Sequence, residues 1–79
     1  MLSVALDTPA EVVIIPPGPG GRAALACRGV DVEGAVRYVV EQLPEGERPR
    51  AVVRTSTMSL FIDEIEALYD QPEFPKALS

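Results

Sequence analysis

The sequence predicts a single small α+β domain, residues 1–79, built as a two-layer sandwich. Two observations support this class. The first third of the chain holds short alternating or β-branched apolar segments, and two later segments, 32–43 and 61–69, repeat apolar residues at helical spacing. The predicted order of elements is β-β-β-α-β-α. We therefore expect a four-stranded mixed sheet that carries both helices on one face.

Three strands are expected before the first helix. The first strand contains Leu2, Val4 and Leu6, which alternate with smaller or polar residues, and the second is the β-branched run 11–15. A turn at 7–10 would join them as a hairpin. Residues 16–21 read PPGPGG and are expected to form a loop, because proline and glycine disfavour both regular elements. Residues 22–28 alternate again and favour a third strand, with an alanine-rich helix as the alternative.

The first helix is predicted at 32–43. Asp31 is a suitable N-cap, Glu33, Arg37 and Glu41 are spaced for two i,i+4 ion pairs, and Pro44 ends the helix. Residues 50–55 then form the fourth strand. We expect the third and fourth strands to be parallel, because a helix connects them and such crossovers are right-handed.

The last helix is predicted to follow a cap at Ser56, Thr57 or Ser59 and to end before Pro72, so that residues 71–79 form a loose tail. Its apolar stripe, including Phe61 and Tyr69, should face inward. In the third and fourth strands the residues expected to face inward are Leu25, Cys27, Ala51 and Val53. The predicted core comprises Leu6, Ile14, Leu25, Val36, Val39, Val53, Ile62, Ile65 and Leu68.

The residue types do not suggest an enzyme. The chain has no histidine, the commonest general base and transition-metal ligand, and Cys27 therefore has no histidine to activate it. The loop at 16–21 is glycine-rich, but its prolines cannot supply the consecutive N–H donors that a phosphate cradle needs. We expect no catalytic residues, no metal and no cofactor. The β-branched apolar run 12–15 is far too short for a membrane span, and a cytoplasmic location is expected.

The net charge of −5 is concentrated near the end of the chain. Up to Met58 there are seven acidic and six basic residues, and beyond it five acidic residues stand against Lys76 alone. On a helical wheel Asp63, Glu66 and Asp70 share one face, opposite the apolar stripe. These three residues are the predicted partner-binding site, and a merely solvated face is the alternative. A metal site on one exposed helix is disfavoured, because cations need oxygens that converge from several elements.

The basic residues predict a second surface. Four arginines occupy strand positions out of phase with the inward residues, beside apolar neighbours, on the sheet face that the helices leave open. Arginine is favoured in protein interfaces, so this face is predicted to mediate a homodimer. Direct binding of nucleic acid is not expected, because the total charge opposes it. The predicted dimer face comprises Val13, Ile15, Arg22, Arg28, Arg50, Val52 and Arg54.

In length, acidity and lack of a catalytic motif, the chain resembles phage-encoded inhibitors of nucleic-acid-guided defence, the anti-CRISPR and anti-restriction proteins. No sequence motif carries this resemblance, so it assigns no functional residue. It implies a non-enzymatic inhibitor that blocks a basic surface on a larger partner, such as a CRISPR or other nucleic-acid-binding complex. The alternatives are a homodimeric structural or regulatory subunit and, third, a small accessory domain of an enzyme.

Overall fold

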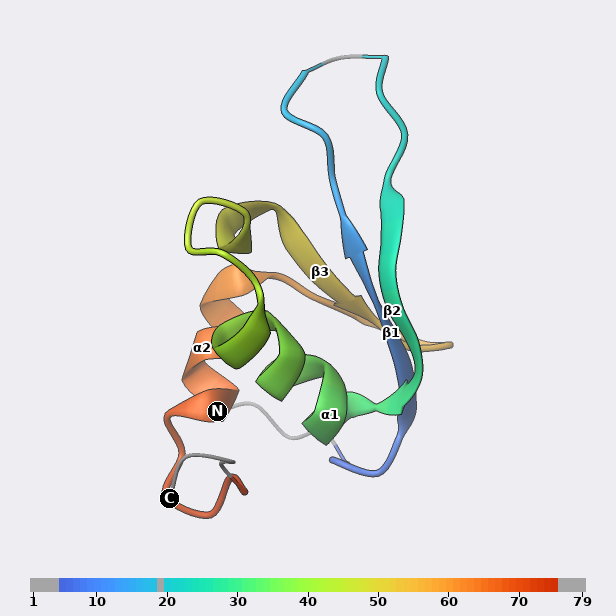
Figure 1. The fold of residues 1–79 in the computed structure, drawn as a ribbon. Coiled ribbons are helices and arrows are strands. Elements are labelled where there is room, and N and C mark those ends of the chain that lie inside the picture. The colour runs from blue at the N-terminus through green and yellow to red at the C-terminus, as the bar shows by residue number, and fades with distance from the viewer. Residues whose placement is uncertain (1–4, 19, 76–79) are drawn as a thin grey trace.

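The computed structural model describes residues 5–18 and 20–75 and is an α+β domain, as predicted. Figure 1 shows both helices against one side of the sheet and the loop of the β1–β2 hairpin projecting beyond it. The elements, in chain order, are β1 (Pro9–Ile14), β2 (Ala24–Asp31), α1 (Val32–Arg37), the π-helix η1 (Tyr38–Gln42), the 3₁₀-helix η2 (Arg48–Arg50), β3 (Ala51–Arg54), β4 (Ser59–Leu60) and α2 (Ile62–Tyr69).

The four strands lie in the order β2-β1-β3-β4, and every neighbouring pair is antiparallel. The predicted mixed sheet is therefore wrong. Because β1 is antiparallel to both β2 and β3, those two strands point in the same direction, but β1 lies between them. β1 is joined to β2 by residues 15–23 and pairs with it at one edge, and its other edge pairs with β3, which follows α1 in the chain.

The predicted order of elements is also wrong at two places. Leu2 and Val4 lie outside the described residues, and Leu6 lies in a turn, where its carbonyl accepts the N–H of Glu33 at 3.0 Å. The fourth strand is instead β4, whose Ser59 and Leu60 pair with β3. The observed order is thus β-β-α-β-β-α.

The helix boundaries follow from hydrogen bonds at their ends. The predicted cap at Asp31 is confirmed, since its Oδ1 accepts the N–H of Gly34 at 2.8 Å. After α1 the chain continues as η1, where the N–H of Leu43 donates to the carbonyl of Tyr38, five residues earlier. The predicted caps of α2 at Ser56, Thr57 or Ser59 are wrong, because Ser59 belongs to β4. Phe61 precedes α2, and its N–H donates to Oε1 of Glu64 at 3.0 Å.

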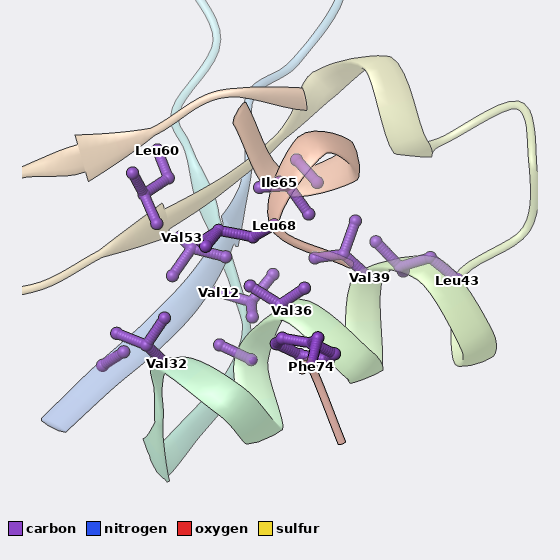
Figure 2. Packing of buried hydrophobic residues seen from close by; sticks show 13 residues of the cluster. Val12, Val32, Val36, Val39, Leu43, Val53, Leu60, Ile65, Leu68 and Phe74 are labelled. Carbon is purple, nitrogen blue, oxygen red and sulfur yellow. The ribbon is translucent and has the colours of Figure 1, made fainter. Parts of the chain in front are cut away.

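The core lies between the helices and one face of the sheet, as Figure 2 shows. Predicted core residues Leu6, Ile14 and Ile62 are half-buried at its edge. In the segment expected as a tail, Phe74 is buried, and its ring centroid lies 5.5 Å from that of Tyr69. The buried cluster is Ala10, Val12, Val32, Ala35, Val36, Val39, Leu43, Ala51, Val53, Leu60, Ile65, Leu68 and Phe74.

Two predicted inward residues face solvent instead. Leu25 pairs with Val13 on the side of the sheet opposite Val12 and is 49% exposed. Residues Leu25 and Cys27 were expected on one side, but β2 contains an extra residue at Ala26, and this bulge reverses the alternation. Phe61 is 55% exposed, because it precedes α2 and does not share the helical stripe.

Candidate functional site: an acidic helix face and an open sheet face

The predicted acidic residues lie on the solvent side of α2 and at its C-terminal end. Asp63, Glu66 and Asp70 are exposed, whereas Ile65 and Leu68 on the other side of the helix are buried. Their spacing of three and four residues places the carboxylates in one line along the helix. We call these three residues the acidic face.

The carboxylates of the acidic face have no cationic partner within residues 5–18 and 20–75. The ion pairs in this part of the chain join Arg37 to Glu33 at 3.2 Å and to Glu41 at 3.9 Å, and Arg54 to Glu11. Asp70 caps the C-terminus of α2, where the helix dipole is negative, and the last turn contains no basic residue. A bound cation would therefore relieve an unfavourable charge distribution.

A hollow of about 350 Å³ adjoins this face and is lined by Val40, Glu66, Tyr69 and Asp70. The hydroxyl of Tyr69 donates to Oε2 of Glu41 at 2.7 Å, which orients the ring at the wall of the hollow. This hydrogen bond, with a smaller contribution from burial, raises the pKa of Tyr69 above its usual 10.0. The hollow thus combines one aliphatic and one aromatic side chain with two carboxylates.

Sequence reasoning did not assign Val40 or Tyr69 to the site. Both were placed in apolar helical stripes, and both are half-buried at the edge of the core. Their roles depend on how η1 lies against α2, and no local sequence signal specifies that contact.

The second surface is the side of the sheet that does not carry the helices, which we call the open sheet face. An apolar row crosses it: Val13 pairs with Leu25 on β2 and with Val52 on β3. Continuing the β3–β4 register beyond Val53–Leu60 places Phe61 next to Val52. The two valines are buried although they lie outside the core cluster, whereas Leu25 and Phe61, at the two ends of the row, are exposed.

A charged row runs beside the apolar row. Arg54 on β3 lies opposite Glu11 on β1 and donates from Nε to Oε2 at 3.0 Å and also from Nη2. On the other side of Glu11, β2 has a bulge formed by Arg28 and Gly29, and the positive φ of 74° at Gly29 is what this bulge requires. Ser59, opposite Arg54, completes the row.

On the far side of the apolar row lie Ile15 and Arg50, joined by an N–H to carbonyl hydrogen bond of 2.9 Å. The structure therefore brings six of the seven predicted dimer-face residues to one side of the sheet, with Ile15 and Arg50 one residue outside β1 and β3. Arg22 is the exception, because it lies in the exposed segment before β2. The sequence did not predict Leu25 and Phe61 on this face. Leu25 reaches it because of the bulge in β2 and Phe61 because it follows the two-residue strand β4, and neither feature has a recognisable sequence pattern.

Within the part of the chain that the structure describes, no group of three or more histidine, cysteine, aspartate or glutamate residues is arranged to hold a metal ion. Cys27 is half-buried against the core. None of the helices among these residues has the length and apolar character needed to cross a membrane.

No protein-family model, curated protein or solved structure matches this chain. What the structure defines is a small α+β domain with two exposed surfaces of different chemistry. Any functional interpretation depends on those surfaces.

Proposed function

We propose that this chain is a non-enzymatic interaction protein that binds a basic surface of a larger protein through the acidic face of α2. One observation supports this above the others. Asp63, Glu66 and Asp70 lack a cationic partner among the described residues, whereas the carboxylates of Glu11 and Glu33 are each paired with an arginine. An acidic surface that served only solubility would usually contain interspersed basic residues.

The arrangement has an electrostatic cost that a partner would remove. Like charges three or four residues apart on a helix destabilise it by about 0.2–0.5 kcal/mol per pair, and α2 together with its C-cap Asp70 has two such pairs along its exposed side. A lysine or arginine from the partner can enter the hollow beside this face. Its aliphatic part would contact Val40 and the ring of Tyr69, and its charged end would lie between Glu66 and Asp70.

The partner class that fits this chemistry is a protein whose basic surface handles nucleic acid, such as a CRISPR complex. Three carboxylates in a line on a rigid helix can take the place of backbone phosphates at such a surface. The chain would then inhibit by occupying the surface, as the resemblance to anti-CRISPR and anti-restriction proteins in size and charge suggests. This mode of action needs no catalytic group and no cofactor.

The experiment compares two variants that carry the same change in net charge. The test variant neutralises the acidic face (Asp63→Asn, Glu66→Gln, Asp70→Asn), and the control neutralises three acidic residues elsewhere (Glu45→Gln, Glu47→Gln, Glu73→Gln). Each is immobilised and used to capture partners from a lysate of the source organism, and association rates with the captured protein are then measured at low and high salt.

We expect the control to bind like the parent and the test variant to associate at least tenfold more slowly at low salt, since exposed charges mainly accelerate encounter. The difference should shrink as salt increases, because screening shortens the reach of charges to about 10 Å at 0.1 M. If the folded test variant binds as fast as the control at low salt, the acidic face is only a solvated surface and the proposal is wrong.

A further inference from the structure

We infer that the open sheet face binds the same face of a second copy of this chain. The two copies are related by a two-fold axis that lies between the two facing sheets, runs parallel to the strands, and passes over the midline between β1 and β3. This inference goes beyond the proposed function, because it concerns the opposite side of the molecule. It rests on three rows of side chains that cross the sheet and on the order of charges within them. These are the charged row, the apolar row, and an outer row formed by Ile15 and Arg50 on the far side of the apolar row.

The apolar row explains why the face needs a cover. Leu25 is 49% exposed, Phe61 55% and Ile15 43%, so three large apolar side chains are half accessible on one side of a small domain. Packed sheets bury such side chains by interdigitating their facing rows. Under the proposed axis, Leu25 of one copy meets Phe61 of the other at each end of the shared row.

The charged row is complementary to itself about this axis. Rotation places β1 of one copy over β3 of the other, so Glu11 faces Arg54 of the second copy, and Arg54 faces its Glu11. Arg28 faces Ser59 of the second copy, and Arg50 faces Ile15. No arginine on the open sheet face lies opposite another arginine.

The alternative axis, across the strands, is much less favourable. It would place each strand over the same strand of the second copy. The charged row of one copy would then lie over the row of Ile15 and Arg50 of the other. Arg54 would then face Arg50 of the second copy, and Glu11 would face Ile15, which leaves a carboxylate against an apolar side chain. The charge order therefore selects the axis parallel to the strands.

This pairing is tested by two single charge reversals, Glu11→Arg and Arg54→Glu, in the full chain. In a homodimer of either variant, position 11 of each copy would face position 54 of the other copy with the same charge, so both contacts would be repulsive. In an equimolar mixture of the two variants, each supplies the charge that the other lacks, so both contacts are complementary again. The oligomeric state is measured by sedimentation equilibrium from micromolar to high micromolar concentration, and circular dichroism checks that each variant is folded.

We expect the parent to dimerise, each single variant to have a dimer dissociation constant at least tenfold higher, and the mixture to recover association as a heterodimer. Leu25→Ala and Phe61→Ala should also weaken the dimer, whereas Met58→Ala should not, although Met58 is similarly exposed at 41%. A parent that stays monomeric over this range would overturn the inference. Folded single variants that dimerise like the parent, or a mixture that stays monomeric beside a dimeric parent, would overturn it as well.

Discussion

Two leucines of the sheet should respond very differently to truncation. Leu60 on β4 is 1% exposed in the core, and Leu25 on β2 is 49% exposed on the opposite side. Removing a buried leucine side chain down to alanine leaves a cavity and costs about 2–5 kcal/mol. Full burial of such a side chain contributes about 1.5–3 kcal/mol, so the half-buried Leu25 should cost about 1 kcal/mol.

The assay is urea unfolding of Leu60→Ala and Leu25→Ala, followed by circular dichroism at a protein concentration low enough to keep the chain monomeric. The slope of free energy against urea should stay unchanged, because both variants expose the same surface on unfolding. If Leu60→Ala does not fold, Leu60→Met tests the same site at a cost below about 1.5 kcal/mol. Equal losses for the two alanine variants would refute the register of β2 and the placement of β4 in the core.

Three further predictions concern local structure. Gly29→Ala should destabilise the fold by about 1–2 kcal/mol, because Gly29 has a φ of 74°, and Gly29→Asn should cost less in the same urea assay. Asp31→Ala should cost about 1 kcal/mol through loss of the N-cap, whereas Asp31→Asn keeps the acceptor and should be nearly neutral. Because the pKa of Tyr69 is raised in the folded state, its contribution to stability is complete below pH 10.0 and is lost as pH rises through the folded-state pKa. The stability difference between the parent and Tyr69→Phe should therefore shrink above pH 10.0, and phenolate absorbance should show the late titration of Tyr69 disappearing in the variant.

Some elements could be predicted because their sequence signals are local. The cap at Asp31, the helical period after it and the β-branched run that became β1 all depend on neighbouring residues alone. The exposed position of Asp63, Glu66 and Asp70 follows equally from spacing on one helix.

Other features depend on contacts between distant segments and leave little trace in the sequence. β4 has only two residues, too few for an alternating pattern, so its Ser59 was interpreted as a helix cap. A single extra residue at Ala26 in β2 was enough to place Leu25 on the other side of the sheet. β3 pairs with β1 and not with β2, and helix connectivity alone predicted the wrong neighbour, because the choice between two distant strand edges leaves no local sequence signal.

The two proposed surfaces lie on opposite sides of the domain, and this leads to a final prediction. Figure 1 shows α2 on the side of the sheet opposite the open sheet face. Ile65 and Leu68 of α2 are buried in the core, so the exposed acidic face lies on the solvent side of this helix. A dimer joined through the sheet faces would therefore present two acidic faces outward. Linking two binding sites can raise the apparent affinity by about 10²–10⁴ on a surface that both can reach.

Glu11→Arg, which is expected to disrupt the dimer, should therefore bind a densely immobilised partner at least tenfold more weakly than the parent. On a sparsely immobilised partner, where only one site can engage, the two should bind alike, because the acidic face itself is unchanged. A surface-binding measurement at two partner densities distinguishes these cases. Equal affinities at both densities would show that the dimer, if it forms, does not act as a bivalent binder.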